Sequence, residues 1–277
     1  MSYLYFNGAF LSADVPFLGA SSRLLRYGDG FFETFVLFEK KIPLLSLHFD
    51  RLADTAQALG MQLPDTFNQA FLLQLALQLA HLCHDTRNAR FRLTISRDNG
   101  GFYVPISDQV QVLLEMQTLE NEGFMLPKNG LRLGTYQQVC KLSSSPLSNL
   151  KTNNALCYIL AARQAAAQGF DDVLLLNEHR HVIESTNSNL FAWYNGALYT
   201  PPLSEGCLNG VLRRRLLHIA RQNGVPIYEK PLLLDDIACC QALWLTNAVQ
   251  GIRWVAEWET NTYQAMDIAP WIAQLMD

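Results

Sequence analysis

A polar segment that contains two glycines and a proline interrupts the regular patterning of this chain near its middle, over 120–130. Apolar periodic stretches lie on both sides of it, and such glycine and proline clusters mark turns and linkers. The chain has 277 residues, of which 49% are hydrophobic, so it is long enough for two modest cores. We therefore expect an N-terminal lobe over 1–120, a linker over 121–130 and a C-terminal lobe over 131–277.

The N-terminal lobe mixes strand and helix patterns. Asn-Gly between alternating apolar residues predicts a hairpin, and an aromatic, β-branched run is typical of a buried strand. Apolar residues at three- and four-residue steps before a glycine predict an amphipathic helix. In chain order we expect a hairpin at Asn7-Gly8, a strand over 31–38, helices over 47–59 and 66–82, and strands over 89–97 and 109–116.

The C-terminal lobe shows the same mixture, and the fold class expected for the whole chain is α+β. Its turns are marked by Gly169 and by Asn195-Gly196, the latter a hairpin signal. In chain order we expect a strand over 131–137, a helix over 155–167, strands over 172–175, 181–185 and 189–193, a further strand over 198–200, a helix over 211–222 and a strand over 242–246.

Charge and hydropathy exclude several classes of function. The formal net charge is −4, and the arginines are scattered apart from a triplet at 213–215, so no basic face for nucleic acid is expected. The N-terminus has no basic region followed by an apolar one, and no apolar run approaches 18 residues. We expect a cytoplasmic protein that acts on a small molecule.

The six cysteines are far apart except for one adjacent pair, and they form no CxxC motif. This spacing predicts reduced, mostly buried thiols. The cluster His81-Leu82-Cys83-His84 lacks a second half of a metal-ligand set, so we expect a polar helix end and no metal site.

Lys151 is a candidate reactive centre. It stands between a serine-rich turn over 142–146 and the apolar run over 155–167, and loop-to-helix junctions beside a core often carry function. A lysine amine in such a place can act as a nucleophile or form a Schiff base with a carbonyl. The alternative is a solvated lysine in a first helical turn.

A glycine-bearing loop over 206–212 precedes an expected helix. The unpaired N–H groups and the positive dipole end of a helix start suit a phosphate. A plain helix cap is the alternative, because Asn-Gly before a helix also occurs as a simple turn.

Six segments, in this order along the chain, carry a family resemblance: RYGDGFFETF (26–35), LLSLHFDRL (44–52), NLKTNN (149–154), VIESTNSNLF (182–191), YTPPLSEGCLNGVLRR (199–214) and LTNAVQGI (245–252). Together they resemble the fold-type IV pyridoxal-phosphate enzymes, the class IV aminotransferase family. That family includes branched-chain and D-amino acid aminotransferases and aminodeoxychorismate lyase. Each segment alone is a weak signal, whereas their common order is specific.

The resemblance implies a two-lobe enzyme with pyridoxal 5′-phosphate between the lobes, and a homodimer. Lys151 matches the Schiff-base lysine, and Glu184 matches the carboxylate that keeps the pyridine nitrogen protonated. A solvated strand glutamate is the alternative for Glu184. Arg51 matches the phosphate-binding arginine. The other cofactor-binding positions implied are Asn154, Asn189, Gly210, Val211, Leu212, Thr246, Asn247 and Ala248.

The substrate end departs from the family pattern. Glu33 lacks the arginine that branched-chain aminotransferases carry three residues later, and the loop over 98–103 lacks the Arg-Asn-His triplet of D-amino acid aminotransferases. The candidate substrate contacts that remain are Tyr27, Glu33, Arg97, Tyr103 and the segment 137–141.

These observations predict amino-group transfer between an amino acid and a 2-oxo acid through a Schiff base on Lys151. Glu33 favours this reaction, because it matches the aminotransferase pattern Gly-Asp-Gly-x-x-Glu. One alternative is aminodeoxychorismate lyase, which releases pyruvate and gives 4-aminobenzoate. The missing carboxylate clamp keeps open another alternative, a non-catalytic protein that binds pyridoxal phosphate.

Overall fold

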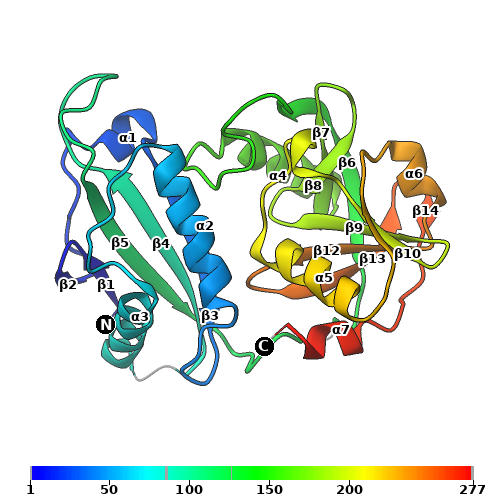
Figure 1. Cartoon of the computed structure of the whole chain (residues 1–277), viewed down its shortest axis with the longest axis horizontal. Coiled ribbons are helices and arrows are strands. Elements are labelled where there is room, and N and C mark those ends of the chain that lie inside the picture. Colours follow the sequence, from blue (N-terminus) through cyan, green and yellow to red (C-terminus); the bar gives the residue numbers. More distant parts are fainter. Residues whose placement is uncertain (1, 85–86, 126, 276–277) are drawn as a thin grey trace. The chain divides into compact units, whose positions relative to one another are not determined.

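The computed structural model of the chain describes residues 2–84, 87–125 and 127–275. The chain forms two compact units (Figure 1). Unit 1 comprises Met1–Gly123 and Lys151–Asn154, and unit 2 comprises Phe124–Leu150 and Ala155–Asp277. The first division, after Gly123, falls inside the segment that we expected to be a linker.

Unit 1 contains a five-stranded sheet in the order β2-β1-β5-β4-β3, and every pair of neighbours is antiparallel. The predicted hairpin at Asn7-Gly8 is confirmed, and both turn residues have positive φ angles, 45° and 96°. The strands are β1 (Tyr3–Phe6), β2 (Ala9–Ser12), β3 (Gly30–Leu37), β4 (Ala89–Arg97) and β5 (Val110–Thr118).

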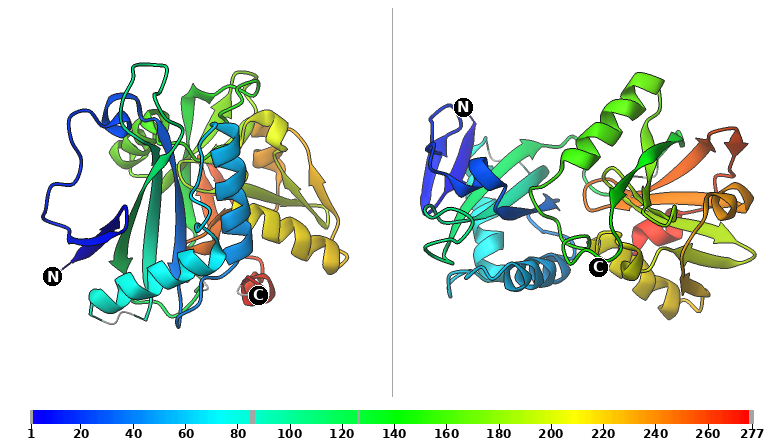
Figure 2. Two further views of the ribbon diagram at one scale, coloured as in Figure 1. Left: turned by 60° about the vertical axis from the view of Figure 1, so that its left-hand side comes forward. Right: turned by 90° about the horizontal axis from the view of Figure 1, so that it is seen from above.

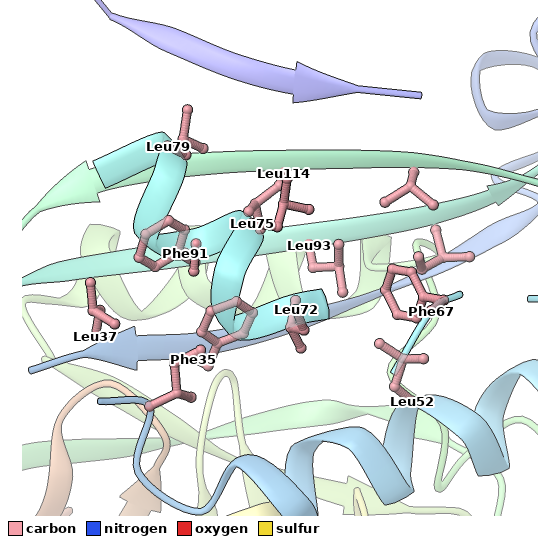
Figure 3. Packing of buried hydrophobic residues seen from close by; sticks show 14 of the residues in the cluster. Phe35, Leu37, Leu52, Phe67, Leu72, Leu75, Leu79, Phe91, Leu93 and Leu114 are labelled. Carbon is pink, nitrogen blue, oxygen red and sulfur yellow. The ribbon is translucent and has the colours of Figure 1, made fainter. Parts of the chain in front are cut away.

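Two helices, α2 (Leu45–Ala58) and α3 (Gln69–Leu82), pack on the same face of this sheet (Figure 2). Their apolar side chains meet alternate residues of β3, β4 and β5, as the period of two along a strand requires (Figure 3). The rings of Phe35 and Phe91 stack there with centroids 5.3 Å apart. A short helix, α1 (Arg23–Tyr27), precedes β3.

Unit 2 contains a sheet that closes on itself, because β8 pairs with β9 as well as with β7. The ring of strands runs β9-β12-β13-β6-β7-β8, and β10 and β11 extend it beyond β9. The strands are β6 (Leu131–Lys141), β7 (Asp172–Asn177), β8 (Val182–Ser185), β9 (Asn189–Tyr194), β10 (Ala197–Thr200), β11 (Ile227–Glu229), β12 (Ala242–Asn247), β13 (Gly251–Trp258) and β14 (Asn261–Thr262).

The unit 2 sheet buries both of its faces. Leu133, Leu174 and Leu245 belong to the core on one face, whereas Leu175 and Ala161 belong to the core under helix α4. The helices are α4 (Leu156–Gln168), α5 (Val211–Gln222), α6 (Leu234–Cys239) and α7 (Ala269–Ala273), with a 3₁₀ turn at Leu203–Glu205.

The elements expected from the sequence are present, and β6 extends past its predicted end to Lys141. Among the described residues, seven elements were not predicted: α1, the 3₁₀ turn at Leu203–Glu205, β11, α6, β13, β14 and α7. Most of them are short, so they show less than two periods of any hydrophobic pattern. Among the residues that the structure describes, no helix is long and apolar enough to cross a membrane.

The expectation of six reduced thiols is wrong for one pair. Cys140 and Cys157 form a disulfide, with their Cα atoms 5.5 Å apart. The end of β6 and the start of α4 bring them together, which their spacing in the sequence does not reveal. Cys83, Cys207, Cys239 and Cys240 remain thiols, and Cys239 is the exposed one.

Candidate active site

Lys151 lies on the edge of the unit 1 sheet. The segment 151–154 runs antiparallel to β3: the N–H of Phe32 donates to the Lys151 carbonyl at 2.9 Å, and the N–H of Asn153 donates to the Gly30 carbonyl at 3.0 Å. Because β3 is the last strand of this sheet, its outer polar groups need such partners. These bonds place Lys151 in unit 1, whereas we expected it in the C-terminal lobe.

The Lys151 side chain lies against an aromatic ring. Its Nζ is 4.4 Å from the centroid of Phe32, and the guanidinium carbon of Arg92 is 3.6 Å from the same centroid. Arg92 also donates to Oδ1 of Asn153 at 3.4 Å. Burial lowers the pKa of Arg92. The lysine amine is therefore set beside a ring and a second cation on one strand edge.

Arg51 is buried on α2, and Glu33 of β3 holds it. Its Nε donates to Oε2 of Glu33 at 2.9 Å, its NH2 group bonds to Oε1, and Nδ1 of His48 lies 2.9 Å from Oε1. Burial raises the pKa of Glu33, but Arg51 and then His48 outweigh it and hold that pKa far below its usual range. The guanidinium fork is thus fixed by an ionised carboxylate.

Glu184 is buried in unit 2, where three groups donate to its carboxylate. Lys141 Nζ and the Tyr158 hydroxyl both reach Oε1, at 2.7 and 2.8 Å, and the N–H of Leu208 reaches Oε2 at 2.8 Å. Burial and then the Glu184 charge raise the pKa of Tyr158 far above its usual value, so the hydroxyl keeps its proton. The solvated strand glutamate that we considered is not what the structure contains.

Glu184, Asn189 and Thr246 form a row across three adjacent strands. Glu184 of β8 lies opposite Asn189 of β9, and Asn189 lies opposite Thr246 of β12. Directly opposed residues point to the same face of a sheet. In a regular strand Glu184 and Val182 would point to the same face. The register between β7 and β8 shifts between Leu175 and Leu176, so the strand is irregular there. Glu184 can therefore lie on the face that α4 covers, although Val182 packs in the core on the other face.

Asn189 fixes the loop that leads into α5. Its amide donates to the Leu208 carbonyl at 2.8 Å. A Cβ atom at position 210 would lie 1.9 Å from the Asn189 Oδ1, so any side chain there would displace the Asn189 amide. Leu208 therefore meets Glu184 through its N–H and Asn189 through its carbonyl, which ties the loop to the row.

The start of α5 has backbone N–H groups that could bind an anion. No described side chain caps this helix, and the N–H groups of Val211 and Leu212 in its first turn have no acceptor within the helix. Thr246 is buried, and its Oγ1 has no hydrogen-bond partner in the described part of the chain. The turn after β12 contains Ala248 and is closed by Asn247, whose Oδ1 accepts from the N–H of Gln250 at 2.8 Å.

The candidate substrate residues divide into two groups. Tyr27 and Tyr103 lie together with ring centroids 5.6 Å apart, and Tyr103 is exposed. Arg97 is buried, and its guanidinium donates to Asp29 at 3.1 Å, to Asp108 and to the carbonyls of residues 59 and 60. Glu33 is likewise occupied by Arg51. The charged groups of Arg97 and Glu33 are therefore bound by partners within unit 1.

Sequence reasoning missed four side chains of this site. Tyr158 and Lys141 hold Glu184, His48 supports Glu33, and Arg92 shares the ring beside Lys151. Lys141 had been noted only as part of the segment 137–141. His48 had a usable signal, because it lies one turn before Arg51 on the same predicted helix.

Unit 1 holds Lys151 on a strand edge, and unit 2 holds the row of Glu184, Asn189 and Thr246; each feature agrees with the resemblance to fold-type IV enzymes. The model of the family "Amino-transferase class IV" matches residues 30–258. The chain belongs to this family, whose members are pyridoxal-phosphate enzymes.

Known proteins of the family resemble the chain over most of its length. Aminodeoxychorismate lyase of Bacillus subtilis is 30% identical over 90% of this chain and 84% of its own. A branched-chain-amino-acid aminotransferase of Pseudomonas aeruginosa is 25% identical over 84% and 77%. The branched-chain aminotransferase of the archaeon Thermoproteus uzoniensis, solved with norvaline, has the same fold, with a TM-score of 0.87, 22% identity and coverage of 99% and 92%.

Proposed function

We propose that this enzyme binds pyridoxal 5′-phosphate and transfers an amino group between an amino acid and a 2-oxo acid. The row of Glu184, Asn189 and Thr246 carries this proposal. One end of the row offers a buried carboxylate to a protonated ring nitrogen. The other end offers the Thr246 hydroxyl to a phosphate, and the uncapped start of α5 offers backbone N–H groups.

The residues present fit the cofactor. A carboxylate has about four acceptor positions, and three donors contact Glu184, so Oε2 keeps room for a ring N–H. The buried Thr246 hydroxyl needs an acceptor, and a phosphate oxygen would supply one. Arg51, which Glu33 already fixes, would add a cationic contact to the phosphate.

When bound, pyridoxal phosphate supplies an aldehyde that joins amines and a ring that draws electrons from the neighbouring carbon. Lys151 Nζ would hold the cofactor and then accept a proton from the amine-bearing carbon of the substrate. Glu184 would keep the ring nitrogen protonated. Asn154, at the end of the lysine segment 151–154, and Asn189 would position these groups.

Lysis of aminodeoxychorismate is the second candidate function. The Bacillus subtilis relative that carries this name is 30% identical over most of the chain. In addition, Glu33 had favoured amino-group transfer, but its carboxylate belongs to the Arg51 ion pair and does not report on the substrate. Either reaction would use the same lysine and the same cofactor site, so these groups do not decide between the two.

One preparation tests both the site and the substrate. Borohydride reduction of the cofactor-loaded protein, followed by peptide mass analysis, should place the phosphopyridoxyl group on Lys151, and the Lys151→Ala variant should carry none. An adduct on Lys128 or Lys141 would contradict the assignment. The same protein is then assayed twice, once with amino acids and 2-oxo acids together and once with aminodeoxychorismate. Pyruvate release without any amino-group transfer would establish the lyase. Cofactor binding without turnover in either assay would establish a non-catalytic binder.

A second copy of this chain is the partner that we propose. The loop between β4 and β5 reaches beyond the ends of these strands (Figure 1) and exposes large apolar side chains. Phe102, Tyr103, Val104 and Ile106 are each about four-fifths exposed or more. Several large apolar side chains exposed on one loop are typical of a protein interface.

The dimer is tested by light scattering after size exclusion. The wild-type protein should elute as a dimer, and the double change of Phe102 and Tyr103 to serine should shift it toward the monomer. Val15→Ser is the control, because it removes an exposed apolar side chain elsewhere in unit 1. A wild-type monomer would refute the proposal.

A further inference from the structure

Two side chains hold one oxygen of the Glu184 carboxylate. Lys141, at the end of β6, and Tyr158, in the first turn of α4, both contact Oε1. Lys141 Nζ also lies 5.6 Å from the Tyr158 ring centroid. The Lys141 side chain is 11% exposed and that of Glu184 4%, so this ion pair is shielded from water. The opposite oxygen, Oε2, receives the Leu208 N–H alone among the contacts described for it.

This arrangement gives the buried carboxylate a countercharge from within unit 2. An ionised carboxylate removed from water without a cation is costly, and breaking a buried pair by removing one partner leaves that cost uncompensated. Lys141 therefore stabilises Glu184 when no cofactor is bound. A protonated ring nitrogen would be a second cation on the same carboxylate, so Lys141 and the ring would repel each other across it.

On the basis of the function proposed above, we propose that Lys141 is a positioning residue with two effects on Glu184. With Tyr158 it occupies Oε1 and so directs a ring nitrogen to Oε2. Its positive charge also limits how strongly Glu184 holds the proton on that nitrogen. Lys141 thus tunes the electron-drawing power of the cofactor without contacting the reacting atoms.

The Lys141→Met variant separates these effects from a merely structural role. In the apo-protein it should lower the melting temperature by about 10 °C, because a buried charge loses its partner. The double variant Lys141→Met/Glu184→Gln should recover most of that loss, because the uncompensated charge is gone. These two measurements need no cofactor. They compare melting temperatures, so they remain informative even if Lys141→Met unfolds well below the melting temperature of the wild type.

The absorption spectrum of the bound cofactor gives the decisive readout. Removing a nearby positive charge favours protonated forms, so the pH-dependent spectral transition of Lys141→Met should move to higher pH by about one unit. Lys141→Arg, which keeps the charge, should leave the transition in place. Lys230→Met is the matched control, because this lysine forms an exposed ion pair with Asp236 in the same unit.

Each result has one meaning. A transition at the wild-type pH in Lys141→Met, or an equal shift in Lys230→Met, would overturn the inference even if the wild-type enzyme is fully active. If the wild-type protein does not bind pyridoxal phosphate, the proposed function fails, while the recovery of apo stability in the double variant still shows the Lys141–Glu184 coupling. A double variant no more stable than Lys141→Met would refute that coupling.

Discussion

Glu33 binds the guanidinium of Arg51 with both of its oxygens, so the carboxylate of the Gly-Asp-Gly-x-x-Glu segment points at a helix of its own unit. Both side chains are buried, and His48 contacts the same carboxylate at 2.9 Å. Glu33 of this segment therefore holds in place Arg51, the predicted phosphate-binding arginine. The identity of residue 33 therefore reports on how Arg51 is held, and it carries no information about the substrate.

Glu33→Gln should change how stability depends on pH. The pKa of Glu33 is far below its usual value, so the stability that it contributes is complete above about pH 5 and is lost as the pH falls below about 4.3. The variant should be less stable near neutral pH, by about 3 kcal/mol, and should lose less stability on acidification. Urea unfolding between pH 3 and pH 7 measures both effects.

The control for this pH dependence is Glu257→Gln, because Glu257 forms an exposed ion pair with Arg132. Its acid profile should match that of the wild type, since exposed pairs contribute little. If the free energy of unfolding changed with pH in the same way for the wild type and Glu33→Gln, Glu33 would not hold Arg51 through its charge.

Glu184→Gln should keep the cofactor but lower turnover on the order of 100-fold, because a neutral amide cannot hold the proton on a ring nitrogen. The cofactor content of the variant is checked by absorbance before the rate is measured. Glu178→Gln serves as the control, since the Glu178 carboxylate accepts from Ser143 on the surface of the same unit. Unchanged turnover in Glu184→Gln would reduce Glu184 to a structural residue.

The sequence could single out candidate residues for the site, because each lies in a short segment with a recognisable local pattern. Lys151 is followed by a helix, Gly210 precedes one, and Thr246 ends an apolar strand. The alternation of apolar residues also placed most strands and helices correctly. Local patterns of this kind depend only on neighbours within a few residues.

The relationships among these residues could not be predicted in the same way. Glu184, Asn189 and Thr246 form a row because the pairing of β8, β9 and β12 closes the sheet, and strand order is not a local property. The register shift that turns Glu184 to the α4 face has no sequence signature. The Cys140–Cys157 contact likewise depends on how α4 packs on β6.

Thiol labelling should count four cysteines before reduction and six after it. In the native protein the exposed Cys239 should react first, because burial raises the pKa of Cys207 and of Cys240 to about 12. Unfolding without a reductant should bring the labelled total to four, and reduction should add Cys140 and Cys157. Six labelled thiols without a reductant would show that this pair is not joined in solution.

Thr246→Val should separate the cofactor site from the stability of unit 2. The Thr246 hydroxyl is buried without a partner in the described structure, so replacing it with a methyl group of the same shape should leave apo stability unchanged or slightly higher. If this hydroxyl donates to a phosphate, the affinity for pyridoxal phosphate should fall roughly tenfold.

Thr200→Val is the matched control, because the buried Thr200 hydroxyl donates to the Leu190 carbonyl at 2.7 Å. That variant should lose about 1 kcal/mol of stability while binding the cofactor normally. Equal cofactor affinity in Thr246→Val and the wild type would exclude Thr246 from the phosphate site.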